Sequence, residues 1–262
     1  MYRAVWKVAR TPLAAGGYVA GALLQAAHRP DLPVLENQDP SGTFGDAKAP
    51  PLRIVFLGDS SITAPGVIPL DDCWVRRVSH HLTDRYRVTA VSVAVGGARI
   101  RTVLTDQLDS ALDAGGDLAC LSVGGNDALR TTRVAAFEED YQEVIGRLCA
   151  AFPFVICGGI GDLSVIPRLP PMARGIAKVR GRSFDNAVAR VASGHPRALK
   201  TKTWGPLWEP FVTDPETFAG DHFHASGRGH AMFAAAAIPV IEEALSISRA
   251  GFAQPDSGES SS

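Results

Sequence analysis

Short apolar runs alternate with longer amphipathic segments over most of this chain. The apolar runs are rich in branched residues and bounded by Gly or Pro, which is typical of buried β-strands. They cover Leu52–Leu57, Val88–Val95, Leu118–Val123, Phe154–Cys157 and, more weakly, Ala198–Trp204. The segments between them have the apolar spacing of helices and cover about Asp71–Asp84, Arg99–Asp113, Val134–Ala151, Met172–Ser193 and Ser226–Ser248. Strands that alternate with helices form parallel β-α-β units, so the pattern predicts one three-layer α/β/α domain with a five-stranded parallel sheet.

The first part of the chain, residues 1–30, follows a different pattern. Basic residues precede a mild apolar stretch, Leu13–Ala27, which is similar to a signal peptide but has a weak core and no convincing cleavage site. This stretch is shorter than the roughly 20 residues that a membrane-spanning helix needs. It therefore predicts a surface helix that can contact a membrane peripherally, with export left open.

Composition also changes on either side of the alternating pattern. Residues 31–51 are rich in Pro, Gly and Asp and lack periodicity, which predicts an extended connector. Residues 52–250 carry the strands and helices of the domain. The Ser- and Gly-rich residues 251–262 predict a disordered tail.

Charge and cysteine content exclude several classes of protein. The chain has 262 residues with 26 basic and 27 acidic side chains, so it lacks the basic excess of a nucleic-acid-binding protein. Its four cysteines form no C-x-x-C pair and no histidine lies at zinc-finger spacing, which argues against a structural metal. Cys120 and Cys157 lie inside apolar runs, as small buried hydrophobes do, and this favours a reducing compartment such as the cytoplasm.

A serine follows the first predicted strand directly, in Gly58-Asp59-Ser60-Ser61. Gly58 permits a sharp turn, and Ser60 then lies at the carboxyl edge of the sheet, where parallel sheets bind their ligands. Ser60 is therefore a candidate nucleophile, with the adjacent Ser61 as the alternative. The competing interpretation is a turn in which Asp59 or Ser60 caps a helix. Ile62 replaces the second glycine of a G-x-S-x-G elbow, so that motif is absent.

Two hydrogen-bond donors follow the next two predicted strands. Gly96-Gly97 can bring a backbone N–H close to a reacting oxygen, or can simply permit a turn. The side chain of Asn126, preceded by two glycines, can donate an amide N–H to a developing oxyanion without losing a proton. Its alternative role is a helix cap or an Asx turn.

A candidate base and its orienting acid precede the last predicted helix. A nucleophilic serine needs a neighbouring base, and that base needs an orienting group. Asp221 and His224, three residues apart, can place a carboxylate against an imidazole. The competing interpretation is a solvated turn. We expect His222 and His230 to be structural, and Asp214 is the other acid that could orient the base.

In this order, GDS, the strand-end glycine, GGND and D-x-x-H resemble the motifs of the SGNH/GDSL hydrolase superfamily. The resemblance covers about Leu52 to Leu245, and the segment Gly161–Arg174 is similar to bacterial lysophospholipase-like GDSL esterases. It implies a flavodoxin-like SGNH hydrolase fold and a serine esterase that needs neither a metal nor an organic cofactor. The sequence departs from the family pattern at two positions. Ala225 replaces the proline that commonly follows the histidine, and the GDSL motif reads GDSS. These departures bear on the subgroup within the family rather than on the activity.

The resemblance also implies a role for each motif residue. Ser60 would be the nucleophile, His224 its base and Asp221 the orienter of that base. The oxyanion hole would consist of the backbone N–H groups of Ser60 and Gly97 and the side chain of Asn126. Gly96 is the alternative to Gly97.

The implied substrate is a small-molecule ester or thioester. Lipid-derived esters, acyl-CoA thioesters and acetylated sugars all suit the chemistry, and the fold does not choose between them. An acyltransferase with the same site and a non-catalytic ligand-binding protein are the alternatives from other classes. Intact Ser, His and Asp residues favour an enzyme over a binding protein.

Overall fold

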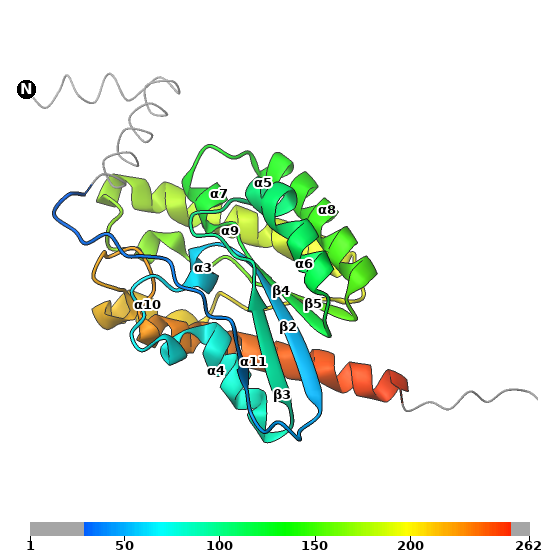
Figure 1. Ribbon diagram of the computed structural model, residues 1–262. Coiled ribbons are helices and arrows are strands. Elements are labelled where there is room, and N and C mark those ends of the chain that lie inside the picture. The colour runs from blue at the N-terminus through cyan, green and yellow to red at the C-terminus, as the bar shows by residue number, and fades with distance from the viewer. Residues whose placement is uncertain (1–28, 253–262) are drawn as a thin grey trace, which may run out of the picture.

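The computed structural model describes residues 29–252, with side chains to residue 248 (Figure 1). The predicted N-terminal surface helix and the predicted disordered tail lie almost entirely outside these residues. The described part is a three-layer α/β/α domain, as the alternation of apolar runs predicts.

The central sheet contains six strands in the order β1-β3-β2-β4-β5-β6. Five of them are the predicted strands and run parallel to one another: β2 (Pro51–Gly58), β3 (Arg87–Ser92), β4 (Leu118–Ser122), β5 (Phe154–Cys157) and β6 (Ala198–Lys200). β3 and β6 end earlier than the apolar runs that predict them. Because β2, β3 and β4 run parallel, the turns that follow them lie at the same edge of the sheet.

The prediction of five strands is wrong by one. Part of the predicted connector forms β1 (Gly42–Phe44), which pairs antiparallel with β3, with Gly42 opposite Ala90 and Phe44 opposite Val88. A strand of three residues is too short to show an alternating apolar pattern. Its position is determined by the free edge of β3, which the sequence of the connector does not reveal.

Two helical layers cover the sheet, because successive side chains of a strand point to opposite faces. Ile54 and Phe56 pack against α4 (Trp74–His81) and α11 (Gly227–Phe252). Val55 and Leu57 point to the other face, which is covered by α6 (Leu108–Ala114), α8 (Val134–Ala151) and α9 (Pro171–Ser193). Within the described residues, one segment, Gly227–Ser248 of α11, is long and apolar enough to span a membrane. Its buried side chains belong to the core beside the sheet.

The predicted helix over Arg99–Asp113 is interrupted. It consists of α5 (Ile100–Thr102), a π-helical turn η3 (Val103–Gln107) and α6. The wide turn lies against β2 and coincides with an inward-pointing Gln107, of which 1% is exposed. π-helical turns often occur at functional sites, and this one contacts β2, the strand that precedes Ser60.

Candidate active site

A sharp turn at Gly58 delivers Ser60 to the carboxyl edge of the sheet. Gly58 has φ +141°, and a Cβ there would lie 1.9 Å from the carbonyl oxygen of Ser122, so no other residue fits. The short helix α3 (Ser60–Thr63) begins immediately, capped by Asp59, whose Oδ1 accepts the N–H of Ser61 at 2.9 Å. The helix cap of the competing interpretation is therefore present, formed by Asp59, and the side chain of Ser60 is left on the wall of a cavity.

Gln107 holds the Gly58 turn from the opposite side. Its Oε1 accepts the Gly58 N–H at 2.8 Å, and its Nε2 donates to the Gly58 carbonyl at 2.9 Å. The side-chain amide thus satisfies both backbone groups of a buried glycine. Sequence reasoning missed Gln107, although it interrupts an apolar helical face formed by Ile100, Val103 and Ala111. A polar residue on such a face is the signal that could have identified it.

Asp221 and His224 are brought together as the D-x-x-H spacing predicts. The Oδ2 atom of Asp221 lies 2.6 Å from Nδ1 of His224, and Oδ1 accepts the backbone N–H groups of Phe223 and His224, each at 3.0 Å. Burial alone would raise the pKa of Asp221, of which 2% is exposed. The hydrogen bonds from the side chain and backbone of His224 outweigh it and lower this pKa to about 2. Asp221 is therefore ionised at neutral pH and lies against the imidazole of His224.

Two of the three alternative residues near this loop, Asp214 and His230, have other partners. Asp214 pairs with Arg228 at 2.9 Å and caps a short 3-10 helix through the N–H of Glu216. His222 is exposed, with φ +59°. His230 is buried and its Nδ1 accepts the N–H of Trp74 at 3.2 Å; burial, with the charges of His224 and Arg77, lowers its pKa to about 3. His230 is neutral at physiological pH and joins α11 to α4.

Asn126 lies between the turns that follow β2 and β3. It belongs to α7 (Gly125–Leu129), and its Nδ2 donates to the Ala98 carbonyl at 3.1 Å and to Oδ2 of Asp59 at 3.4 Å. The amide is thus held beside Asp59-Ser60 on one side and Gly97-Ala98 on the other. Burial raises the pKa of Asp59 to about 6, despite the hydrogen bonds from Ser61.

Gly96 and Gly97 need to be glycine for different reasons. Gly97 has φ +76°, a left-handed conformation that side chains disfavour, and the space around it is open. At Gly96 a Cβ would lie 1.9 Å from Oδ1 of Asn37. Of the two glycines, Gly97 directly precedes Ala98, whose carbonyl accepts the amide of Asn126.

Arg168 is a second residue that sequence reasoning did not identify individually. Its Nη1 lies 4.0 Å from Oδ2 of Asp221, with 16% of its side chain exposed, and its backbone N–H donates to the His222 carbonyl. The guanidinium adds positive charge near Oδ2 of Asp221, the same oxygen that contacts Nδ1 of His224. Its segment, Gly161–Arg174, was singled out only by its family resemblance.

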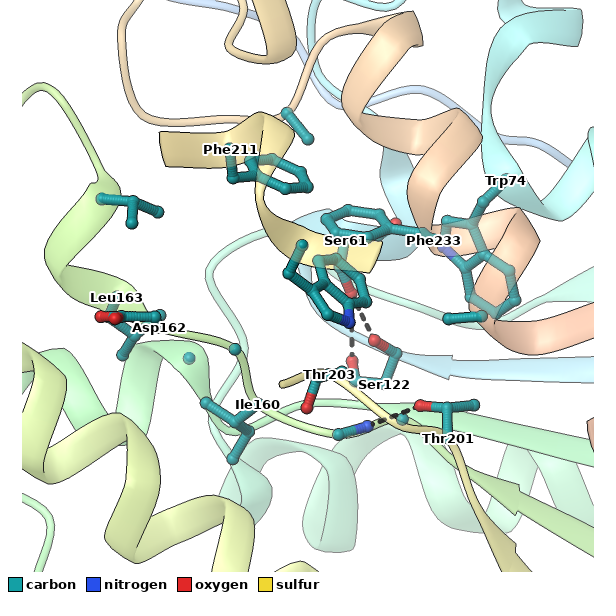
Figure 2. Close-up of a pocket in the computed structure, with 18 of the residues that line it drawn as sticks. Ser61, Trp74, Ser122, Ile160, Asp162, Leu163, Thr201, Thr203, Phe211 and Phe233 are labelled. Carbon is teal, nitrogen blue, oxygen red and sulfur yellow. Dashed lines mark hydrogen bonds between the residues drawn. The ribbon is translucent and has the colours of Figure 1, made fainter. Parts of the chain in front are cut away.

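A cavity of about 570 Å³ connects these groups. Its walls include Ser60, Asn126 and His224, and the rest is mostly apolar, with contributions from Leu129, Ile160, Leu163, Val165, Ile166, Trp204, Trp208, Phe211, Phe218, Phe223, Phe233, Ala236 and Ala237. Figure 2 shows Phe211 and Phe233 on one side of this space and Ile160 and Leu163 on another. It also shows Ser61 paired with Ser122 at 2.7 Å between their Oγ atoms, so the hydroxyl of Ser61 already has a partner.

The arrangement contains the parts that acyl transfer through a serine requires. A serine at a strand edge, an imidazole held by an ionised carboxylate and an amide donor share one cavity. Within residues 29–252, no group of three or more His, Cys, Asp or Glu side chains is placed to hold a metal ion.

Comparison with known proteins identifies the family of the chain. The chain belongs to the GDSL-like lipase/acylhydrolase family, which it matches over residues 56–232. It is 25% identical over 203 residues to the GDSL-like esterase Rv1075c of Mycobacterium tuberculosis, a match that covers 74% of this chain. The chain spans 63% of the length of that relative. The resemblance drawn from the four sequence motifs is confirmed.

Crystal structures support the fold. The acetylxylan esterase Axe2 from Geobacillus stearothermophilus superposes with a TM-score of 0.56 at 17% identity, covering 74% of this chain and 95% of that chain. TesA superposes with a TM-score of 0.58 at 21% identity, covering 74% and 99%. At these identities the likeness concerns the fold alone. The predicted α/β fold is confirmed, apart from the added edge strand.

Proposed function

We propose that this protein is a serine hydrolase that cleaves carboxylic esters or thioesters with an apolar acyl chain. The observation that carries the proposal is the cavity that joins Ser60 and His224 to a largely apolar interior. Membership in the lipase/acylhydrolase family supports the reaction type. The carboxylate of Asp221 on the far side of the imidazole supports His224 as the base.

The proposed reaction proceeds in two acyl transfers. The Oγ atom of Ser60 attacks the carbonyl carbon while Nε2 of His224 takes its proton, and Asp221 stabilises the imidazolium. When the tetrahedral intermediate collapses, the leaving alcohol or thiol takes that proton from His224. Water then attacks the acyl-enzyme with His224 again as base, which releases the acid and restores Ser60.

The oxyanion of each tetrahedral intermediate needs donors that are fixed in advance. Ser60 and Gly97 supply backbone N–H groups in this proposal, and Asn126 supplies its Nδ2. The 3.1 Å bond from Nδ2 to the Ala98 carbonyl supports this role, because it fixes the amide with one of its two hydrogens before substrate binds. The oxyanion would take the second hydrogen, in place of the longer 3.4 Å contact with Asp59. Prior fixation removes the cost of reorganising the donors during the reaction.

The lining of the cavity argues for an acyl chain rather than an acetylated sugar. A sugar would place hydroxyl groups against walls such as Phe211, Phe233 and Ile160, where most would lose their hydrogen bonds to water. An alkyl chain gains from the same contacts, by about 0.8 kcal/mol for each buried methylene. The structurally similar protein Axe2 is an acetylxylan esterase, so an acetylated sugar is the alternative substrate with which we compare an acyl chain.

The kcat/KM for p-nitrophenyl esters is therefore expected to rise with acyl chain length. From acetate toward octanoate, each methylene that enters the cavity should add up to about fourfold, the equivalent of 0.8 kcal/mol. The gain should end when the cavity is full. Steady-state kinetics on the ester series measures this, and fastest turnover of the acetate would contradict the assignment of the acyl chain.

Neighbouring alanines on α11 provide a matched control for the chain-length series. Ala236 lines the cavity, whereas Ala235 is exposed and points away from it. Ala236→Leu is expected to reduce turnover of the octanoate while leaving the acetate almost unchanged. Ala235→Leu should leave both unchanged, and equal effects of the two variants would place the acyl chain elsewhere.

Asn126→Ala is expected to lower kcat by about two to three orders of magnitude with little change in KM. The amide acts mainly on the charge that develops in the transition state, so its loss affects kcat rather than substrate binding. Asn126→Asp should be at least as damaging, because it places a negative charge beside the oxyanion. Separate measurement of kcat and KM tests this prediction. A near-normal kcat in both variants would show that Asn126 has a structural role in its helix and does not stabilise the oxyanion.

A further inference from the structure

The first turns of α9 expose an apolar stripe to solvent. Met172, Ile176 and Val179 are 50%, 42% and 67% exposed. Their spacing of four and three residues places them on one face of the helix. The opposite face, which includes Ala173 and Ala177, is buried in the domain. The stripe therefore lies on the outside of the helical layer, where Figure 1 shows α9 beside α7 and α8.

Basic side chains flank this stripe on both sides. Lys178 and Arg182 lie along one flank, and both are exposed. On the other flank, Arg180 donates to the carbonyls of residues 128, 130 and 132, which holds the loop with the exposed Arg130 and Arg133 beside the helix. Residues 163–184 contain five Arg or Lys and no Asp or Glu. An apolar centre between basic borders is the pattern of a helix that lies in a lipid interface.

The basic flank is continuous with the wall of the cavity. Lys178 pairs with Asp162 at 2.9 Å, and the guanidinium of Arg182 lies 4.7 Å from the ring centroid of Trp204. Asp162 and Trp204 both line the cavity. A surface that covers the stripe would therefore lie beside two residues of the cavity wall.

We propose that this face of α9 docks onto an anionic lipid surface. Met172, Ile176 and Val179 enter the boundary between headgroups and acyl chains, and the flanking Arg and Lys contact the anionic headgroups. A second copy of this chain fits less well, because two such faces would bring their basic flanks together. The docking is independent of the proposed esterase activity, since it needs no catalytic residue.

Vesicle co-sedimentation of the full-length protein tests this docking. Vesicles of phosphatidylcholine with roughly 30 mol% phosphatidylglycerol should bind the protein, and vesicles of phosphatidylcholine alone should bind it much less. The combined substitution Met172→Gln, Ile176→Gln and Val179→Gln should weaken binding by at least about tenfold. Glutamine is a good helix former, so the helix itself is retained. Ile247→Gln, at an exposed position near the far end of α11, is the matched control and should bind like the wild type.

Three results would overturn the proposal. Undiminished vesicle binding by the triple variant would assign lipid contact to another part of the chain. Equal binding to neutral and anionic vesicles would remove the role of the basic flanks. Loss of self-association in the triple variant, seen by size-exclusion chromatography, would make the stripe an interface between copies. Hydrolysis of a short soluble ester, measured in parallel, shows whether the esterase proposal stands separately.

Discussion

Ser60→Ala is expected to lower the kcat of ester hydrolysis by about six orders of magnitude, as loss of a serine nucleophile does in other hydrolases. Without its Oγ the acyl-enzyme cannot form, and only the oxyanion donors and substrate binding remain. The variant should fold normally, because the cap of α3 comes from Asp59 and the turn is fixed by Gln107. Steady-state kinetics and a thermal melt measure the two effects.

Ser61→Ala is the matched control. The hydroxyl of Ser61 lies 2.7 Å from that of Ser122 and 3.4 Å from its carbonyl oxygen, so its loss removes contacts with Ser122 and no proposed catalytic group. A fluorophosphonate probe should label the wild type and Ser61→Ala but not Ser60→Ala. Labelling that persists in Ser60→Ala would transfer the nucleophile to another serine.

The strands and long helices could be predicted because each has its own periodic pattern. Val134–Ala151 agrees at both ends, and the buried run Phe154–Cys157 is a strand with those same bounds. The edge strand Gly42–Phe44 could not, because its hydrogen bonds come from β3, more than forty residues away. The local sequence of a segment shows the hydrophobic periodicity of a helix or strand. It does not show which distant strand has a free edge with which a short segment can pair.

The site shows the same limit at the level of single residues. Asp221 and His224 are near neighbours in sequence, so their contact follows from local spacing. Gln107 reaches Gly58 across 49 residues, and Arg168 reaches Asp221 only after α9 and α11 have been placed. Residues that position a group from a distant segment need the packing of the whole domain before they can be recognised.

The cavity was likewise outside the reach of sequence analysis. Its walls come from the turns after several strands and from α11, and aromatic side chains form one side of it. Phe211 and Phe233, for example, have ring centroids 5.7 Å apart although they lie on different helices. The sequence therefore predicts the chemistry of the site, while the apolar shape that favours an acyl chain follows from tertiary packing.

Asp221→Asn is expected to lower kcat by about four orders of magnitude. The Oδ2 atom of Asp221 lies 2.6 Å from Nδ1 of His224, and in the proposed mechanism it accepts the Nδ1–H, which leaves Nε2 as the base for Ser60. An asparagine amide can donate to Nδ1 instead and so stabilise the tautomer that cannot accept the proton of Ser60. The loop should survive, because an asparagine Oδ1 still accepts the N–H groups of residues 223 and 224.

The pH profile distinguishes this role from a purely structural one. Because the pKa of Asp221 is lowered to about 2, its charge is constant over the working range, and the acid limb of kcat/KM reports other groups: the proposed base and the buried Asp59, whose pKa is raised to about 6. Removing the negative charge disfavours imidazolium, so the residual activity of Asp221→Asn should persist to lower pH than in the wild type. Asp214→Asn, which loses only its pairing with Arg228, should retain kcat within a few-fold and an unmoved acid limb. A larger loss from Asp214→Asn than from Asp221→Asn would assign the orienting carboxylate to Asp214.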